Sequence, residues 1–248
     1  MILEKVKSKY NQFGLKATIF SALRYPLIRI KWFFLLNKKT SEIFKTIHNE
    51  NLWSSSESKS GRGSEMEYTV NLRNWLIQNI PKYKINTIVD CPCGDFNWMK
   101  NVLPHVSVNY LGFDIVDELI ENNKKKYSGK NVNFFKLKMI EERIPNCDLL
   151  IIRDCLFHFS YKDINKFLTN IKRTEYKYLL ITSHIVSENF KNKDIKTGSF
   201  RIINLLSHPF NFEAKNILDC VKDYPEDSPI PREMLLIKKE FVTTSLSL

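Results

Sequence analysis

The stretch NTIVDCPCGDFNW, residues 86–98, is a short apolar run that passes directly into a turn. A run of this length, bounded by Pro and Gly, predicts a buried strand that ends near Asp90. In an open α/β sheet, ligands bind beyond the carboxyl ends of the strands. We therefore expect the turn at residues 91–96 to lie over a binding crevice. A helix beginning near Asn97 would offer free backbone N–H groups there.

A second acid, Asp114, closes the next apolar run, 24 residues after Asp90. This is about the spacing at which an acid accepts hydrogen bonds from a ribose. A dinucleotide site needs three glycines near the pyrophosphate, whereas this turn has Gly94 alone and Asp95 would repel phosphate. The turn therefore argues against NAD. It favours S-adenosylmethionine (SAM), which has an adenosine but no phosphate and carries cationic sulfonium and amino groups.

The remaining pattern alternates as a parallel sheet with crossover helices requires. Strands are predicted at residues 87–90, 110–114, 132–136, 149–153 and 178–182, and helices at 97–102, 117–127 and 161–172. A capping box at Ser64 and Glu67 predicts a further helix that runs to Ile80, before Pro81. Two strand-like runs within residues 210–242, separated by a proline-rich turn, predict an antiparallel hairpin at the sheet edge.

The composition, 248 residues with 43% apolar side chains, favours one large domain. We expect a basic helical arm at residues 1–50 and the main domain at residues 51–248. The 38 Lys and Arg against 27 Asp and Glu give a formal charge of +11. This excess favours a polyanionic partner such as nucleic acid, anionic lipid or a phosphorylated substrate, and the alternative is a set of solvated helix faces.

The most apolar part of the arm, PLIRIKWFFLL at residues 26–36, is too short to span a membrane and is interrupted by Arg29 and Lys31. We expect the segment 24–39 to pack on the main domain or on a partner chain, with a homo-oligomer left open. The alternative is peripheral contact with an anionic membrane surface. The five cysteines lack paired Cys-x-x-Cys spacing and follow no secretory signal, which favours reduced thiols and a cytoplasmic location, or the inner face of the membrane.

The decapeptide DCPCGDFNWM resembles the first motif of class I SAM-dependent methyltransferases, with Pro92 and Phe96 in place of glycines. The resemblance implies that Gly94 approaches the methionine part of SAM, that Asp114 binds the ribose, and that Asp90 orients the turn or the amino group. After the third strand, Lys138 or Met139 stands where these enzymes usually carry an acid near the adenine. The cofactor-binding residues implied are Asp90, Cys91, Pro92, Gly94, Asp95, Asp114, Ile115 and Arg153.

Further segments between residues 57 and 212 are similar to a bacterial methyltransferase family of polysaccharide-modifying enzymes, some of which resemble capsular sugar-nucleotide heptose O-methyltransferases. These segments are ESKSGRGSEMEYT, YLGFDIVDELI, DLLIIRDCLFHFS, YLLITSH and NKDIKTGSFRIINL with HPFNF. The resemblance implies a Rossmann-like class I methyltransferase fold of the α/β class. Its mostly parallel seven-stranded sheet would carry an antiparallel C-terminal hairpin strand and helices on both faces. It also implies O-methylation of a sugar or nucleotide-linked sugar, with S-adenosylhomocysteine as product.

The fourth predicted strand ends in IIRDCLFHF, which places Asp154 and His158 where an acceptor would meet the methyl group. An attacking hydroxyl needs a base, and His158 is the first candidate, with Asp154 orienting it or acting as the base. A lone histidine among apolar residues is more often a packed core residue, and this is the alternative for His158. His184, just after the fifth predicted strand, also points to the crevice and is the reserve candidate. The same three side chains, with Asn192 and Asp194, are also of the types that could hold a divalent cation to assist the reaction.

Two loops carry substrate-binding candidates. The glycines of SGRGS precede a predicted helix and could wrap a phosphate with backbone N–H groups, and Arg201 could bind another phosphate in a bidentate manner. The alternative is a linker and a polar surface loop. The residues concerned are Ser60, Gly61, Arg62, Gly63, Ser64, Asn192, Asp194 and Arg201.

Two other functions stay open. The charge and the aromatic residues Trp32, Phe33, Phe34 and Trp53 would suit an RNA methyltransferase. Against it, the sequence has no recognisable RNA-binding module, and RDCLFH lacks the Asn/Asp-Pro-Pro-aromatic signature of many amino-directed enzymes. A non-catalytic scaffold of the same fold is the second alternative.

Overall fold

The structure is a computed structural model that describes residues 32, 34–226 and 228–242. The chain divides into two compact units, Met1–Lys39 and Thr40–Leu248. Most of the expected membrane-contact segment 24–39 lies outside the described residues. Helix α2, Thr40–Asn49, which we grouped with the arm, belongs to the second unit. Among the described residues, none of the helices has the length and apolar character needed to cross a membrane.

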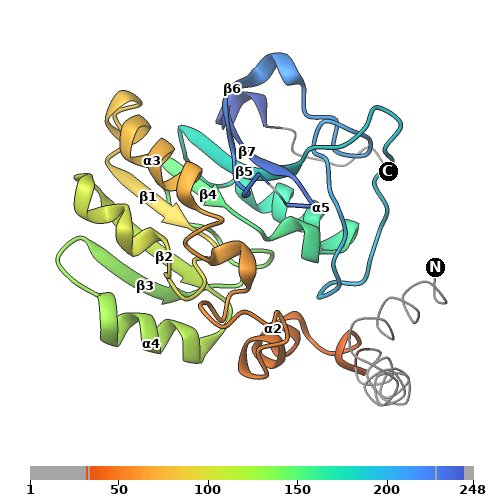
Figure 1. Cartoon of the computed structure of the whole chain (residues 1–248), viewed down its shortest axis with the longest axis horizontal. Coiled ribbons are helices and arrows are strands. Elements are labelled where there is room, and N and C mark those ends of the chain that lie inside the picture. The colour runs from red at the N-terminus through yellow and green to blue at the C-terminus, as the bar shows by residue number, and fades with distance from the viewer. Residues whose placement is uncertain (1–31, 33, 227, 243–248) are drawn as a thin grey trace. The chain divides into compact units, whose positions relative to one another are not determined.

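The second unit is built on a seven-stranded sheet with the order β3-β2-β1-β4-β5-β7-β6 (Figure 1). Strands β1 to β5 are parallel, and β7 runs antiparallel to both β5 and β6. The bounds are β1 Thr87–Asp90, β2 Asn109–Asp114, β3 Val132–Lys136, β4 Leu149–Ile152, β5 Tyr178–His184, β6 Ile217–Lys222 and β7 Arg232–Lys238. The chain moves outward from β1 first to β2 and β3 and then to β4, so the carboxyl end of β1 is a topological switch point.

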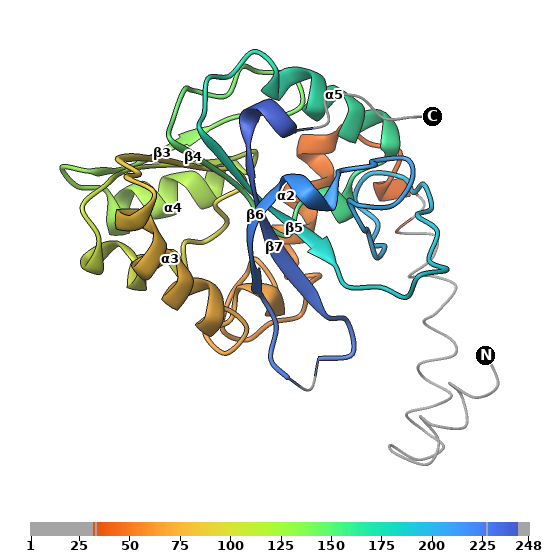
Figure 2. The same ribbon diagram turned by 90° about the horizontal axis from the view of Figure 1, so that it is seen from above.

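Helices cover both faces of this sheet, as Figure 2 shows from above. Along β1, Ile88 packs into one core with α3 and α4, and Val89 packs into the other core with α5. The helices are α3 Val70–Lys82, α4 Asp117–Tyr127 and α5 Tyr161–Ile171. Side chains alternate between the faces of a strand, and burying each large aliphatic residue contributes about 1.5–3 kcal/mol. The two apolar faces therefore account for the layered fold.

Two predicted helices differ from the structure. Helix α3 begins at Val70 instead of near Ser64. The Ser64 N–H, which Glu67 would accept from in a capping box, donates to the Gly61 carbonyl at 2.9 Å. The helix also continues past Pro81, since the Tyr83 N–H still reaches the Asn79 carbonyl.

The helix expected at 97–102 is instead a pair of short 3-10 turns, η2 Met99–Asn101 and η3 Leu103–His105, the second of which contains Pro104. The turn after β1 therefore has no α-helix directly behind it. The other short 3-10 elements are η1 Arg62–Ser64, η4 Leu156–His158, η5 Ala214–Asn216 and η6 Lys239–Phe241.

Candidate active site

A pocket lies at the carboxyl ends of β1, β2 and β4 and holds about 970 Å³, counting the open space at its mouth. A concave site at the carboxyl ends of the strands of an open α/β sheet is where small-molecule ligands bind. The predicted residues that line it are Ser60, Ser64, Asp90, Cys91, Pro92, Gly94, Asp114, Ile115, Arg153, Asp154 and His158. The predicted residues that do not line it are Gly61, Arg62, Gly63, Asp95, His184, Asn192, Asp194 and Arg201.

Gly94 forms the floor of this pocket. Its φ of +55° is in the left-handed region, and a Cβ on it would collide with the Ser60 hydroxyl. Its N–H donates to Asp114 Oδ2 at 3.2 Å, while the Val116 N–H donates to Asp114 Oδ1 at 3.0 Å. The first and second strands are thereby joined through Asp114, and burial raises the pKa of its carboxyl to about 6. Glycine suits this position because its φ is in the left-handed region and the Ser60 side chain leaves no room for a Cβ.

Asp95, which was predicted to bind the cofactor, does not line the pocket. Its carboxylate accepts from the Ser58 hydroxyl, at 2.9 Å to each oxygen, and from the Lys59 N–H at 2.9 Å. Its own N–H donates to Ser60 Oγ at 2.8 Å. Asp95 therefore holds the loop of residues 58–60 over the turn, and its charge is used inside the protein.

Asp90 is buried at the end of β1. The Tyr110 hydroxyl donates to its Oδ2 at 2.7 Å, and Oδ1 has no hydrogen-bond partner among the described residues. Burial raises the pKa of this carboxyl to about 7. An unpaired buried oxygen that lines a pocket is suited to accept a hydrogen bond from a cationic ligand group, which would also favour the ionised form.

The far end of the pocket is an apolar slot. Its side chains come from the segment after β2, from α4 and from the segment after β3. They are Ile115, Val116, Leu119, Leu137, Met139 and Ile140. Of the two candidates that stand in place of the usual adenine-binding acid, Met139 lines the slot, whereas Lys138 forms an exposed ion pair with Glu141 at 3.3 Å. A flat heterocycle would be held here by apolar contact and backbone groups.

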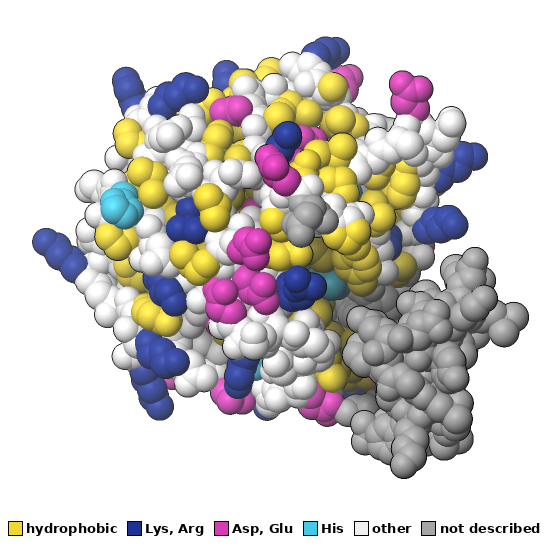
Figure 3. Space-filling model, viewed as in Figure 1, with side chains coloured by type: hydrophobic (Ala, Val, Ile, Leu, Met, Phe, Trp, Pro, Cys, Tyr) yellow, Lys and Arg dark blue, Asp and Glu magenta, His cyan; other side chains and the backbone are white. Residues whose placement is uncertain are grey.

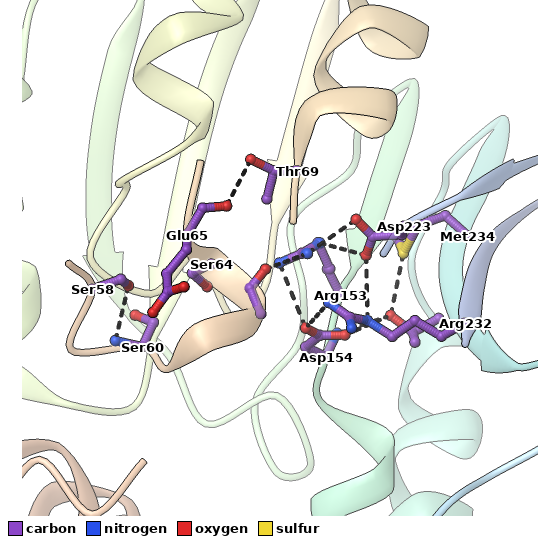
Figure 4. A network of polar contacts seen from close by, with 12 residues as sticks. Ser58, Ser60, Ser64, Glu65, Thr69, Arg153, Asp154, Asp223, Arg232 and Met234 are labelled. Atoms are coloured by element: carbon purple, nitrogen blue, oxygen red, sulfur yellow. Dashed lines mark hydrogen bonds and ion pairs between the residues drawn. The ribbon is translucent and has the colours of Figure 1, made fainter. Parts of the chain in front are cut away.

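Arg153 lies between two carboxylates next to the pocket, as Figure 4 shows. Its Nε and Nη2 bind Asp223 at 2.8 and 3.0 Å, and its Nη1 lies 3.6 Å from Asp154 Oδ2. Arg232 Nη2 binds the same Asp154 oxygen at 2.8 Å and its Nε lies 3.5 Å from Asp223. Two arginines and two aspartates thus balance each other's charge. We call these four residues the Arg-Asp network.

The Arg-Asp network changes the role expected for Asp154. Burial opposes its ionisation, yet the charges of Arg232 and Arg153 outweigh burial and hold the pKa of the Asp154 carboxyl below its ordinary value. No hydrogen bond between Asp154 and His158 is present in the described structure. Asp154 is therefore a fixed negative charge at the pocket wall, and it does not orient His158.

The sequence analysis missed Asp223 and Arg232, which come from the C-terminal hairpin. The one available signal was an acid directly after one strand-like run and an arginine at the start of the next. Nothing in their spacing pointed to Arg153.

His158 lies at the end of the 3-10 turn η4 and lines the pocket. Its Nδ1 is 2.8 Å from the Ser199 carbonyl oxygen. Since a carbonyl only accepts, Nδ1 carries the proton and Nε2 has the free lone pair. Burial lowers the pKa of the imidazole below its ordinary value, so it is neutral at pH 7. The Trp53 ring lies beside it, with 5.5 Å between centroids.

The segment 198–201 holds this histidine in place. The Gly198 N–H donates to the His158 carbonyl at 2.7 Å, and the Arg201 N–H donates to the Phe157 carbonyl at 3.2 Å. Arg201 Nη1 also donates to the Phe159 carbonyl at 2.5 Å. Three consecutive carbonyl groups around His158 are therefore bound by one segment. Arg201, predicted to bind substrate, does not line the pocket and instead binds the backbone carbonyl groups next to His158.

His184, Asn192 and Asp194 serve the structure instead of lining the pocket. His184 is buried against the backbone of Ile203, with Nδ1 at 3.1 Å from the carbonyl oxygen, and burial lowers the pKa of its ring to about 4. The Asn192 amide binds the Asn204 and His208 carbonyls, and Asp194 accepts from the Tyr161 N–H at 2.7 Å. In the described part of the chain, no three His, Cys, Asp or Glu side chains are grouped as a metal ion would need.

The SGRGS segment is packed against the Arg-Asp network. The Gly63 carbonyl accepts from Arg153 Nη2 at 2.6 Å, and a Cβ on Gly63 would collide with Asp154. Arg62 lies over the Tyr68 ring at 5.9 Å. The glycines therefore serve close packing, and Ser60 and Ser64 are the members that line the pocket. A phosphate-wrapping loop was the expectation, and this packing argues against it.

Helix α2 and the residues after it form part of the pocket wall that the sequence analysis did not predict. Thr40, Phe44, His48 and Trp53 line the pocket from this side. The helix is amphipathic and short, and no motif marks it. Its part in the site depends on packing against distant elements.

The chain matches no protein-family model, and no curated protein is significantly similar to it in sequence. Solved structures are similar in fold. A SAM-dependent methyltransferase of Leishmania major has a TM-score of 0.56 at 18% identity, over 84% of this chain and 89% of that one. A didemethyltoxoflavin N-methyltransferase of Burkholderia thailandensis, solved with S-adenosylhomocysteine, has a TM-score of 0.58 at 11% identity, over 84% and 89%.

A magnesium protoporphyrin IX methyltransferase of Synechocystis, also solved with S-adenosylhomocysteine, has a TM-score of 0.55 at 9% identity, over 81% of this chain and 99% of that one. Together with the strand order, these similarities confirm the predicted Rossmann-like class I methyltransferase fold.

Proposed function

We propose that this protein is a SAM-dependent O-methyltransferase that methylates a hydroxyl of a sugar or nucleotide-linked sugar, as in the assembly of a capsular polysaccharide. The observation that carries the methyl-transfer part is one pocket that combines the Asp90–Gly94–Asp114 constellation with a neutral histidine whose Nε2 is free to act as a base. Similarly folded proteins hold SAM or its product, which supports SAM as the ligand of this pocket.

The pocket offers a group for each part of SAM. The unpaired Asp90 Oδ1 would accept a hydrogen bond from the amino group, and the turn at Gly94 leaves room for the methionine part. Asp114 would accept from the ribose, and the slot around Leu119 and Met139 would hold the adenine. When bound, SAM supplies a methyl group on a cationic sulfonium, which is transferred by in-line displacement.

The residues of this chain supply alignment and a proton acceptor. Nε2 of His158 takes the proton from the attacking hydroxyl as the new bond forms, while the Ser199 carbonyl keeps the ring in the required tautomer. Asp154 stays ionised beside the pocket and stabilises the imidazolium that results. Placing the two reactants side by side in one pocket would supply a large share of the rate enhancement.

One observation supports the acceptor class. The Trp53 ring next to His158 offers an apolar face against which the C–H groups of a sugar could pack. Nε and Nη2 of Arg201 are buried with no hydrogen-bond partner among the described residues, but Arg201 does not line the pocket, so these nitrogens carry no argument for a phosphate on the acceptor.

The nucleic-acid alternative has less support. On the face shown in Figure 3, the coloured lysine and arginine side chains are spread around the edge and mixed with acidic and apolar ones. A continuous basic strip, as single-stranded RNA would need, is not seen on that face among the described residues. The charge of +11 therefore carries no argument for RNA by itself.

The test is incubation of the protein with methyl-labelled SAM and, in parallel, nucleotide-linked sugars, free sugars and total RNA, followed by mass spectrometry. Label on a sugar hydroxyl, lost in His158→Ala while SAM binding persists, supports the proposal. Label on RNA alone contradicts the acceptor class. A chelator arm with added divalent cation decides whether the reaction needs a metal, and Asp114→Ala, which should not bind SAM, serves as the control for the cofactor site.

A further inference from the structure

His48 is a buried histidine of α2 that faces the pocket without using its ring nitrogens. It is 4% exposed, and neither Nδ1 nor Nε2 has a hydrogen-bond partner among the described residues. Buried polar atoms in native proteins are nearly always paired, so a missing partner points to a ligand or a water molecule. The same pocket contains Gly94 and Asp114.

The position of α2 places His48 near the ribose end of the pocket. With its amide nitrogen turned toward acceptors, Asn49 reaches Glu118 at 3.3 Å, and Glu118 is in the first turn of α4, just after Asp114. The charges of Lys59 and Asp95, which belong to the loop and turn over Gly94, also act on His48. The ring therefore lies between the Gly94 turn and the start of α4.

The protonation state of the imidazole indicates which chemical group of a ligand it can bind. Burial, followed by the charge of Lys59, lowers the pKa of His48 below its ordinary value, so the ring is neutral with one N–H donor and one acceptor nitrogen. A carboxylate only accepts hydrogen bonds and would favour a charged ring. A hydroxyl can donate to one nitrogen or accept from the other, so a neutral imidazole complements a vicinal diol.

We propose that His48 is a ligand-binding residue that hydrogen-bonds the ribose hydroxyls of the bound cofactor from α2, opposite Asp114. This inference rests on the proposed function and adds a contact that no sequence motif marks. In this proposal α2 covers the adenosine part of the pocket.

The test compares His48→Phe and His48→Gln with the wild type, and uses His105→Phe on an exposed 3-10 turn as the matched control. Calorimetry measures binding of S-adenosylhomocysteine and of methylthioadenosine, which keeps the ribose but lacks the amino acid part. We expect His48→Phe to weaken both ligands by a similar factor, about tenfold. His48→Gln, which keeps a donor and an acceptor, should retain most of the affinity, and His105→Phe should be unchanged.

Two further readouts separate ligand binding from a structural role. The melting temperature of ligand-free His48→Phe should equal or exceed that of the wild type, since an unpaired buried polar ring is replaced by an apolar one. The 2′,3′-dideoxy form of methylthioadenosine should bind the wild type more weakly, and His48→Phe should reduce this difference.

Unchanged affinities in His48→Phe would overturn the inference, as would weakening of S-adenosylhomocysteine alone, which would indicate the amino acid part. A lower melting temperature with an unchanged ribose dependence would identify His48 as a packing residue. Failure of the wild type to bind any of these ligands would instead overturn the proposed function itself.

Discussion

Nε and Nη2 of Arg153 bind both carboxylate oxygens of Asp223, at 2.8 and 3.0 Å, although the residues are 70 positions apart in the chain. Both side chains are almost completely buried. The bond ties the end of β4, where the acceptor would react, to the hairpin of β6 and β7. The antiparallel edge of the sheet is therefore part of the site as well as of the fold.

The first prediction concerns this ion pair. Asp223→Asn removes the charge that balances a buried arginine, and breaking a buried pair in this way costs about 3–5 kcal/mol. We expect a loss of this size in urea denaturation. Glu226→Gln, at an exposed position of the same hairpin, should be neutral. Equal stability of Asp223→Asn and wild type would mean that Asp154 alone can balance both arginines.

The second prediction concerns pH and Asp90. Its folded pKa of about 7 is above the ordinary 3.8, so between these values the folded protein binds more protons than the unfolded chain. Stability of the ligand-free protein should therefore fall as pH rises from about 4 to about 7. SAM affinity should change in the opposite direction, because ionised Asp90 favours the cationic amino group. Asp90→Asn should remove part of both slopes, measured by denaturation and calorimetry at pH 5 and 8.

The third prediction concerns the base. His158→Ala should slow methyl transfer by about 10²–10⁴-fold and leave SAM binding nearly unchanged. In the wild type, activity should decline as pH falls through a value below 6.5, since burial lowers the pKa of this ring. Initial rates from pH 5 to 8 measure this. Wild-type turnover by His158→Ala would show that another group accepts the proton.

The fourth prediction compares two glycines. A Cβ on Gly63 would collide with the Asp154 carboxylate and lie 3.0 Å from Arg232 Nη2, whereas a Cβ on Gly129 meets no atom within 4 Å. We expect Gly63→Ala to lower the melting temperature and impair activity by displacing the Arg-Asp network. Gly129→Ala should be neutral or stabilise by about 0.4–1 kcal/mol. If both variants melt alike, the 58–64 loop shifts more easily than its contacts indicate.

Much of the fold could be predicted because it depends on local patterns. The strands β1 and β3 and helix α4 have the predicted bounds, since short apolar runs and a helical repeat are properties of neighbouring residues. The helix starts were less predictable: in place of the capping box at Ser64, the Ser64 N–H donates to the Gly61 carbonyl and the Met66 N–H donates to Glu57. The folded loop decides which partner each of these N–H groups takes, and the motif alone does not show it.

The candidate site divides in the same way. Asp90 and Asp114 are the last residues of β1 and β2, and Gly94 and His158 lie in the segments after β1 and β4, so their order in the chain placed them at one edge of the sheet. His184 ends a strand too, β5, but it packs against the backbone of Ile203, and the loop residues Asn192 and Asp194 bind backbone groups. Whether a polar side chain faces a pocket or its own backbone depends on what the remaining chain leaves unpaired.

The sequence by itself therefore determined the parallel sheet and the turn after β1, because the strand periodicity and Gly94 are local features and each of the acids Asp90 and Asp114 ends its own strand. Only the tertiary structure decided the partners: Asp223 for Arg153, Arg232 for Asp154, Ser199 for His158, and α2 with His48 for the pocket. Such pairings bring together segments far apart in the chain. Their selection depends on charge balance and burial in the folded protein, which no local pattern contains.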